Sequence, residues 1–173
     1  MSSHQVAERP ADNFSALASG RVLAARQIWI MLRSRPHGLD DSPHRMKSPS
    51  GNVLIVEDDP DVREMLSALL TTEGFHTVAA EDGLEGLHLL RTMRRRAPET
   101  PCLVLLDLKM PRFGGREFRR AQLSDPTVAG VPVAVISGAT DLEELARALG
   151  AVATLPKPID CDVLLEVVRR YCA

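Results

Sequence analysis

The stretch Val53-Leu-Ile-Val-Glu-Asp-Asp-Pro60 decides the fold of this chain of 173 residues. Val53 to Val56 is a short apolar run rich in β-branched residues, which predicts a strand buried on both faces of a sheet. Asp59 and Pro60 then supply an N-cap and a first-turn proline, which predict that a helix follows directly. A buried strand that leads straight into a helix is typical of a parallel sheet covered by helices.

Strand and helix patterns continue to alternate through the rest of the chain. Apolar runs predict strands at 53–56, 75–80, 102–106, 131–136 and 152–155. Helical spacing of apolar residues predicts helices at 60–73, 84–96, 115–123, 141–149 and 160–171. Strands that are joined through helices lie parallel, with right-handed crossovers and helices on both faces. We therefore expect an α/β fold, in which a doubly wound, five-stranded parallel sheet is flanked by five helices.

The apolar positions of the helices predict which side faces the sheet. In the second helix, the residues expected to point inward are Leu84, Leu87, Leu90 and Met93. In the closing helix, which Asp160 caps, they are Val163, Leu164, Val167 and Val168. The arginine runs 94–96 and 119–120 are expected to lie on solvated helix faces.

Residues 1–50 differ in composition from residues 51–173. They carry seven Lys/Arg against four Asp/Glu, whereas the remainder carries 14 against 19. We expect a disordered N-terminal extension ahead of a single domain at 51–173. Two alternatives remain open: Phe14 to Arg35 forms a helix that binds a partner or touches a membrane, or translation starts at Met46 and the preceding residues are not native.

The charge and hydropathy patterns exclude several classes of function. The formal net charge is −2, and the basic runs are not interleaved with aromatic residues, so we expect no direct contact with nucleic acid. The apolar stretch from Val22 to Leu32 contains Arg26 and is too short to cross a bilayer, so we expect no membrane span.

The three cysteines predict a reducing compartment. Their number is odd, they form no C-x-x-C motif, and no secretory signal precedes them. We therefore predict a cytoplasmic protein in which Cys102 fills an apolar position and Cys161 and Cys172 are incidental thiols.

Polar residues follow the predicted strands at their carboxyl ends, where ligands bind in doubly wound sheets. Glu57 and Asp58 follow the first strand, and the other strand-end residues are Asp107, Ser137 and Lys157. Two carboxylates about 5 Å apart repel by roughly 3 kcal/mol at an effective dielectric near 20. Because oxygen ligands of this kind suit hard divalent cations, we expect a Mg²⁺ or Mn²⁺ site formed by the carboxylates of Glu57, Asp58 and Asp107.

The same residues provide what phosphoryl transfer to a carboxylate requires. The transition state spreads negative charge over the phosphoryl oxygens, so catalysis depends on positioning and on neutralising that charge. Asp107 would be the in-line nucleophile. Lys157 would hold a phosphoryl oxygen, and the Ser137 hydroxyl would donate a further hydrogen bond.

Four sequence blocks resemble the signature blocks of response regulator receiver domains. The blocks are Val53-Leu-Ile-Val-Glu-Asp-Asp59, Leu105-Leu-Asp-Leu-Lys-Met-Pro111, Val135-Ile-Ser-Gly138 and Leu155-Pro-Lys-Pro158. They occur in the family's order and at its spacing, over about Asn52 to Tyr171. The resemblance implies a flavodoxin-like fold with strand order 2-1-3-4-5.

The resemblance also implies a role for each matching residue. Glu57 and Asp58 match the acidic metal-binding pair, Asp107 matches the phosphorylated aspartate, and Lys109 matches the position whose main-chain carbonyl contacts the metal. Ser137 and Lys157 match the hydroxyl and the lysine that contact the phosphoryl group. Pro158 matches a proline that often follows a cis peptide bond. Thr154 departs from the family, which often has a switching aromatic residue there, so the coupling from Ser137 is expected to differ.

The resemblance implies a signalling switch rather than an enzyme with a separate substrate. Because no room for an output domain remains before Ala173, we expect a stand-alone receiver. The expected phosphoryl donor is a sensor histidine kinase or a histidine phosphotransfer protein, and the expected output is an unidentified protein partner or onward relay. Two alternatives are a phosphate-ester hydrolase of the haloacid dehalogenase type and a degenerate receiver that only binds partners. The hydrolase requires a second aspartate where Lys109 stands, and the degenerate receiver would not require every site residue to be present.

Overall fold

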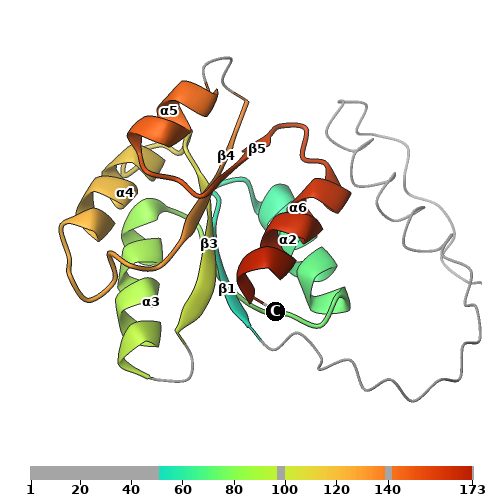
Figure 1. Cartoon of the computed structure of the whole chain (residues 1–173), viewed down its shortest axis with the longest axis horizontal. Helices are drawn as coiled ribbons and strands as arrows, with labels where there is room; N and C mark the ends of the chain where they lie inside the picture. The colour runs from blue at the N-terminus through green and yellow to red at the C-terminus, as the bar shows by residue number, and fades with distance from the viewer. Residues whose placement is uncertain (1–50, 97–99, 139–141, 173) are drawn as a thin grey trace, which may run out of the picture. The chain divides into compact units, whose positions relative to one another are not determined.

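The computed structural model describes residues 51–96, 100–138 and 142–172. These residues form one parallel sheet of five strands in the order β2-β1-β3-β4-β5, which confirms the predicted fold class (Figure 1). The strands are β1 (Asn52–Val56), β2 (His76–Ala80), β3 (Pro101–Asp107), β4 (Val133–Ser137) and β5 (Ala153–Pro156). The helices are α2 (Pro60–Thr72), α3 (Gly83–Arg95), α4 (Gly115–Leu123), α5 (Leu142–Ala148) and α6 (Cys161–Cys172).

The expectations for residues 1–50, including the helix from Phe14 to Arg35 and the start at Met46, lie outside the described residues. Within the described part, each predicted strand and helix is present, and its bounds differ from the predicted ones by at most two residues. Among the described helices, none has the length and apolar character that crossing a membrane requires.

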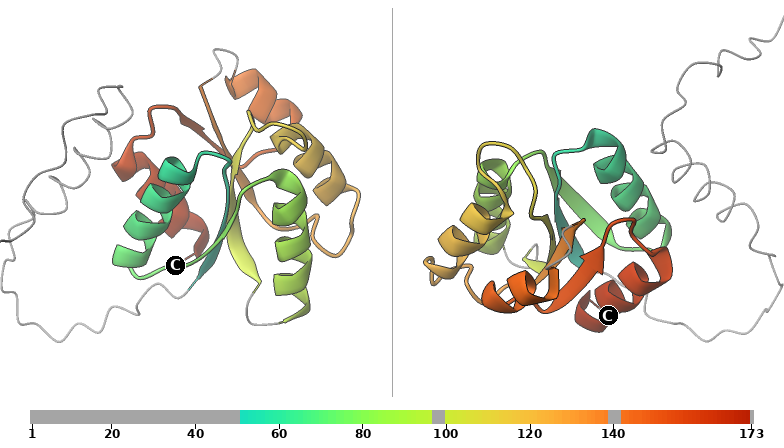
Figure 2. Two further views of the ribbon diagram at one scale, coloured as in Figure 1. Left: turned by 180° about the vertical axis from the view of Figure 1, so that it is seen from behind. Right: turned by 90° about the horizontal axis from the view of Figure 1, so that it is seen from above.

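The sheet is covered on both faces. Helices α2 and α6 lie on one side, and α3, α4 and α5 lie on the other (Figures 1 and 2). Successive residues of β1 point to opposite faces, so Val53 and Ile55 pack in the core beneath α2 and α6, while Leu54 and Val56 pack beneath α3 and α4. All four residues are fully buried. This explains why the sequence of β1 is continuously apolar instead of alternating between apolar and polar residues.

Carboxylate caps begin three of the helices. The Asp59 side chain accepts hydrogen bonds from the backbone N–H groups of Asp61 and Val62 at the start of α2. Asp82 and Asp160 cap α3 and α6 in the same way. These caps place the beginning of each helix directly after its strand or loop, because they satisfy backbone donors that the helix leaves unpaired.

Two residues predicted to be buried are exposed instead. Leu84 is 62% exposed and Val163 is 44% exposed, so both predictions are wrong. In α3, Gly83 and Gly86 are buried, and a Cβ on Gly86 would lie 2.8 Å from a methyl group of Val56. The close approach at these glycines rotates the buried stripe of α3 away from Leu84.

In α6, the buried residues are Leu164, Leu165, Val168 and Cys172. This stripe lies further round the helix than the predicted one, and it leaves Val163 on the exposed side. The helix therefore packs against the sheet along a line that ends at Cys172.

The expectation that Arg119 is solvated is also wrong. Arg119 is 6% exposed, and its guanidinium donates hydrogen bonds to the backbone carbonyls of Leu149 (2.8 Å) and Gly150 (2.9 Å) and to the side-chain oxygen of Gln122 (2.7 Å). Carbonyls at a helix C-terminus carry partial negative charge, so this arginine caps the end of α5. Burial lowers the pKa of Arg119.

Gln122 completes this arrangement, which we call the Arg119–Gln122 network. Its amide nitrogen donates to the backbone carbonyls of Val128 (3.1 Å) and Val131 (2.9 Å), which lie in the loop before β4. The network thus joins α4 to the end of α5 and to the entry of β4.

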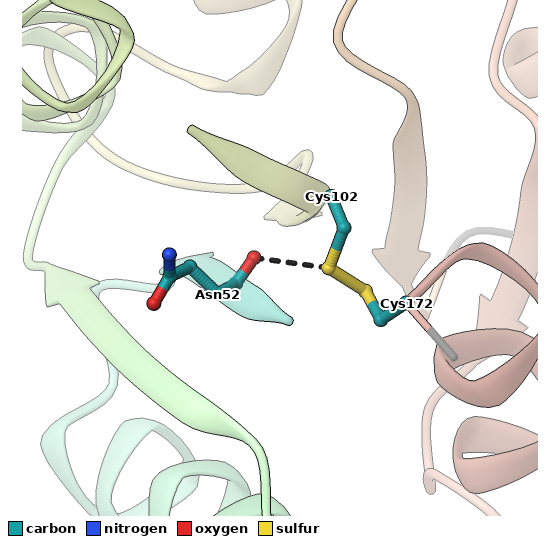
Figure 3. The surroundings of a disulfide bond; sticks show 3 residues. All are labelled: Asn52, Cys102 and Cys172. Carbon is teal, nitrogen blue, oxygen red and sulfur yellow. Dashed lines mark hydrogen bonds between the residues drawn. A yellow bond between two sulfur atoms is a disulfide. The ribbon is translucent and has the colours of Figure 1, made fainter. Parts of the chain in front are cut away.

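Two predictions about the cysteines are wrong: that Cys102 only fills an apolar position and that Cys172 is an incidental thiol. Cys102 and Cys172 form a disulfide, although 70 residues separate them in the sequence, and Cys161 is free (Figure 3). Counting and spacing the cysteines could not reveal this pair, because only the packing of α6 against β3 brings them together.

Candidate functional site

Three carboxylates meet at the carboxyl ends of β1 and β3. Val56 pairs with Leu106 in the register of the two strands, so the residues that follow, Glu57 and Asp107, lie side by side. One oxygen each from Glu57, Asp58 and Asp107 can be chosen so that all three lie within 4.8 Å of one another. Glu57 is fully buried and Asp107 is 3% exposed. We call these three residues the acidic cluster.

Lys157 joins the acidic cluster from the segment that follows β5. Its ammonium nitrogen donates hydrogen bonds to Asp107 Oδ2 (2.8 Å) and to both carboxylate oxygens of Glu57 (3.0 and 3.1 Å). The Lys157–Pro158 peptide bond is cis, as the resemblance implied. A single side chain therefore links the two buried carboxylates, which come from different strands.

Ser137 ends β4 next to this lysine. It is 1% exposed, and its backbone carbonyl accepts a hydrogen bond of 3.0 Å from the backbone N–H of Lys157. Asp107 pairs with Ile136 in the parallel ladder, so Ser137 is one residue beyond the strand position that faces Asp107. The backbone thus holds Ser137, Lys157 and Asp107 at one edge of the sheet.

The turn after β3 orients Asp107. The backbone N–H of Lys109 donates a 3.0 Å hydrogen bond to Asp107 Oδ1, while the Lys109 side chain is exposed. Gly115 begins α4 so close to this strand that a Cβ at position 115 would collide with the backbone carbonyl oxygen of Asp107. Each carboxylate oxygen of Asp107 therefore accepts a hydrogen bond, Oδ1 from the Lys109 backbone and Oδ2 from Lys157. Helix α4 packs directly against the backbone of Asp107.

Arg63 is a site residue that the sequence reasoning missed. From α2, its guanidinium donates to the backbone carbonyls of Glu57 (2.7 Å) and Asp58 (3.3 Å). These bonds hold the main chain of the acidic turn, and they bring a positive charge behind it. A basic residue on the first turn of the helix after an acidic pair is the signal that could have indicated it.

Burial and repulsion dominate the electrostatics of the cluster. Burial, followed by repulsion from Asp107, raises the pKa of Glu57 from 4.5 to about 7, against the opposing effect of Lys157. For Lys157, burial lowers the pKa, but hydrogen bonds and attraction to Asp107 and Glu57 outweigh burial and raise it. Both directions indicate a site with more negative charge than its single ammonium can balance.

The donor set fits a small, hard divalent cation. Three carboxylate groups within 4.8 Å of one another supply only oxygen ligands, which Mg²⁺ and Mn²⁺ prefer. The half-buried Asp58 lies at the edge of the cluster, so water could complete the coordination of an ion bound there.

Thr154 lies on β5 opposite Val135 and is half-buried. It occupies the position where the family often has an aromatic residue, so this departure from the family pattern lies close to Ser137 on the neighbouring strand. Its effect on coupling stays a prediction.

Comparisons with known proteins agree with this geometry. The family model described as the response regulator receiver domain matches residues 53–169. Sporulation initiation phosphotransferase F of Bacillus subtilis is 32% identical over 120 residues, which cover 69% of this chain and 91% of that protein. The DNA-binding response regulator MtrA of Mycolicibacterium smegmatis is 35% identical over 119 residues, which cover 68% of this chain and 48% of that protein. The chain thus spans about half the length of MtrA.

Solved structures give the same result. The chemotaxis response regulator CheY4 of Vibrio cholerae superimposes with a TM-score of 0.62 at 27% identity, and the match covers 70% of this chain and 98% of that one. A response regulator receiver protein of Pseudomonas putida matches with a TM-score of 0.60 at 31% identity, over 70% of this chain and 97% of that one. The chain therefore belongs to the response regulator receiver domain family of two-component signalling.

Proposed function

We propose that this domain accepts a phosphoryl group on Asp107 from a sensor histidine kinase or a histidine phosphotransfer protein. The observation that carries the proposal is the ammonium of Lys157, which lies 2.8 Å from Asp107 Oδ2 and 3.0 Å from Glu57 within one buried acidic cluster. A structural salt bridge requires only one carboxylate for each lysine. Lys157 instead bonds two carboxylates, those of Glu57 and Asp107, and the carboxylate of Asp58 lies beside them.

The proposed metal site consists of the acidic cluster and the main-chain carbonyl of Lys109. When bound, Mg²⁺ or Mn²⁺ would neutralise the carboxylates and the phosphoryl oxygens. Arg63 would keep the Glu57–Asp58 main chain in place for this purpose, because its guanidinium bonds both carbonyls.

In the proposed transfer, a carboxylate oxygen of Asp107 forms a bond to phosphorus as the P–N bond of the donor phosphohistidine breaks. The electron pair of that bond returns to the imidazole, which takes a proton from solvent. Lys157 would shift its hydrogen bonds from the carboxylate oxygens to a phosphoryl oxygen, and Ser137 would donate to another. Slow attack by water would later release inorganic phosphate and restore the carboxylate, so no separate substrate is turned over.

Phosphorylation would change the surface built by α5, β5 and α6. An acyl phosphate on Asp107 carries a charge of about −2 in place of the −1 of the carboxylate, which would draw Ser137 and Lys157 inward. The hydrogen bond from Lys157 N–H to the Ser137 carbonyl couples the ends of β4 and β5, so movement at either residue would reach both strands. A coupling of about 1–3 kcal/mol would be enough to bias a partner-binding surface.

We favour a stand-alone cytoplasmic receiver whose output is a protein partner or onward relay of the phosphoryl group. The match over 91% of sporulation initiation phosphotransferase F supports this form. In MtrA, by contrast, the matched part is only 48% of a protein described as DNA-binding.

The test is phosphorylation by acetyl phosphate with Mg²⁺, followed by intact mass. We expect one phosphate adduct on the wild-type chain, no adduct on Asp107→Asn, and no adduct on wild type when a chelator is present. Asp61→Asn is the matched control, because Asp61 is an exposed aspartate of α2 outside the acidic cluster, and it should be labelled like wild type. An unlabelled wild-type chain, or equal labelling of Asp107→Asn, would contradict the proposal.

A further inference from the structure

The end of β3 opposite Asp107 carries a second chemical feature. Cys102, the second residue of β3, is bonded to Cys172, the last residue of α6, with a Cα–Cα distance of 5.2 Å (Figure 3). This distance falls within the usual range for disulfides. The bond joins the edge of the sheet to the end of the helix that covers it.

Three segments of the chain meet at this bond. The Cys102 sulfur lies 3.1 Å from the backbone carbonyl oxygen of Asn52, at the start of β1 (Figure 3). A Cβ on Gly51 would lie 2.7 Å from the Cys102 sulfur and 2.8 Å from the Cys172 Cβ, so the backbone at position 51 packs directly on the pair. Sulfur fits this place in both oxidation states, because a thiol at Cys102 would donate to the Asn52 carbonyl, while a disulfide sulfur has no hydrogen and only contacts it.

The pair is separate from the proposed phosphorylation site. Asp107 is five residues further along β3, which corresponds to roughly 16 Å of extended strand. The other end of α6 begins shortly after Lys157. The disulfide therefore holds the far end of a helix whose near end follows the lysine of the acidic cluster.

We propose that Cys102 and Cys172 form a reversible redox site that responds to peroxides. Oxidation closes the disulfide and fastens the last turn of α6 to the start of β3, and reduction by a dithiol releases it. Redox state then becomes a second input to the domain, in addition to the phosphoryl group.

The oxidation is a two-electron step. The thiolate of Cys102, the half-buried member of the pair, attacks a peroxide oxygen, the O–O bond breaks, and a sulfenic acid forms with release of water. The sulfur of Cys172, which is 9% exposed, then attacks the sulfenic sulfur and displaces hydroxide, which leaves as a second water. Two thiols and one molecule of hydrogen peroxide thus give one disulfide and two waters, and thiol–disulfide exchange with a dithiol reverses the change.

Cys161 provides an internal control. It begins α6, eleven residues before Cys172, so the helix separates the two by roughly 16 Å. Burial and then the charges of Asp160 and Asp162 raise the pKa of the Cys161 thiol, which reduces its thiolate fraction. The free cysteine is therefore expected to stay reduced while the pair responds.

The first test counts thiols in the full-length chain after treatment with hydrogen peroxide or with dithiothreitol. We expect one titratable thiol after peroxide and three after dithiothreitol, and zero and two in Cys161→Ser. Peptide mapping should join Cys102 to Cys172 within one chain. Three thiols after peroxide, a bond to Cys161, or a disulfide between two chains would overturn the proposal.

The second test measures the consequence for α6. Closing a loop of this length is expected to raise the melting temperature of the oxidised form by about 10 °C over the reduced form. Hydrogen exchange at the amides of Val168 to Cys172 should be slower in the oxidised form. Cys161→Ser should keep both differences, and Cys172→Ser should lose both and melt like reduced wild type. Equal melting and equal exchange in the two forms of wild type would refute the proposal.

Phosphorylation distinguishes this proposal from the proposed function. Both redox forms should acquire one phosphate from acetyl phosphate, because the pair lies at the other end of β3. Labelling in both forms without any redox difference in melting would reject the redox site alone.

Discussion

Two polar groupings in the described part of the domain, both largely buried, differ in how their charge is balanced. In the Arg119–Gln122 network, one guanidinium is surrounded by neutral oxygens, and Gln122 donates to two backbone carbonyls. In the acidic cluster, three carboxylates lie close together, and the ammonium of Lys157 bonds two of them, those of Glu57 and Asp107. Among the described residues, every buried side-chain nitrogen and oxygen has a hydrogen-bond partner. The two groupings therefore differ in charge rather than in hydrogen bonding.

This difference separates a structural role from a functional one. The partial charges at the end of α5 complement Arg119 without any ligand, so the network is complete within the fold. Two carboxylates about 5 Å apart repel by roughly 3 kcal/mol, so the cation proposed above would relieve a repulsion that the Arg119–Gln122 network does not have. Four substitutions or conditions test this contrast.

Removing Gln122 should have the largest effect on stability. Gln122→Ala deprives Arg119 of an acceptor and two buried carbonyls of their donor, and it leaves a cavity in a fully buried position. We expect the free energy of unfolding in urea to fall by about 4 kcal/mol. Labelling by acetyl phosphate should persist at temperatures where the variant is folded, because the network does not touch Asp107.

Arg120→Ala is the control for this substitution. Arg120 is exposed on the same helix, so its loss should change stability by less than about 0.5 kcal/mol. If both variants lost a similar amount of unfolding free energy, the loss would reflect any substitution in α4 and would contradict a specific contribution from the Arg119–Gln122 network.

Removing the ammonium should slow phosphorylation strongly. Lys157→Met deletes the donor that contacts both Asp107 and Glu57, so the rate of labelling by acetyl phosphate should fall about 100-fold. Lys109→Met is a matched change, because the Lys109 side chain is exposed and its backbone N–H, which bonds Asp107, is retained. A comparable fall in the labelling rate of Lys109→Met would contradict the proposal that the Lys157 ammonium promotes phosphorylation.

The acidic cluster should make stability depend on pH when divalent ions are absent. The pKa of Glu57 is about 7 in the folded protein against an ordinary value of 4.5. The folded state therefore keeps a proton that the unfolded chain has lost, and stability falls as pH rises through this range. In the presence of EDTA, the free energy of unfolding should decrease by about 2 kcal/mol between about pH 5 and pH 8.

Glu57→Gln should remove most of this pH dependence, because glutamine does not titrate. Chemical denaturation of both proteins across the same pH range provides the comparison. An equally steep decrease in Glu57→Gln would assign the pH dependence to other groups.

Arg63 should have the smallest of the four effects. Arg63→Ala frees the main chain of Glu57 and Asp58, and loss of such supporting contacts should weaken Mg²⁺ binding about 10-fold in calorimetric titration. Glu64→Ala, an exposed neighbour on α2, should change the affinity much less. Unchanged affinity in Arg63→Ala would mean that the turn holds its shape without the arginine.

Much of the fold could be predicted because local patterns determine it. The apolar run of β1 and the Asp59 cap lie within a few residues of each other, and each reports the conformation of its own backbone. The errors at Leu84 and Val163 arose because the rotation of a helix depends on its contacts. The glycines of α3 bring it close to Val56, and the stripe of α6 follows Leu164, Val168 and Cys172.

The candidate site could be predicted for a related reason. Parallel strands place their carboxyl ends at one edge, so Glu57, Asp107 and Lys157 were expected at the same edge of the sheet once the strands were assigned. The contacts of Arg63 and Arg119 could not be predicted in this way, because a long side chain on a helix reaches either solvent or a neighbouring carbonyl. The arrangement of the surrounding loops decides between the two.

By itself, the sequence determined the alternation of strands and helices, the parallel sheet and the edge where the charged residues gather. These follow from periodicity, capping and strand direction, which act over short distances along the chain. Only the tertiary structure decided that Arg119 is buried, that Lys157 bridges two carboxylates and that Cys102 meets Cys172. Such contacts join residues 30, 50 and 70 or more positions apart, and they depend on how whole helices pack against the sheet.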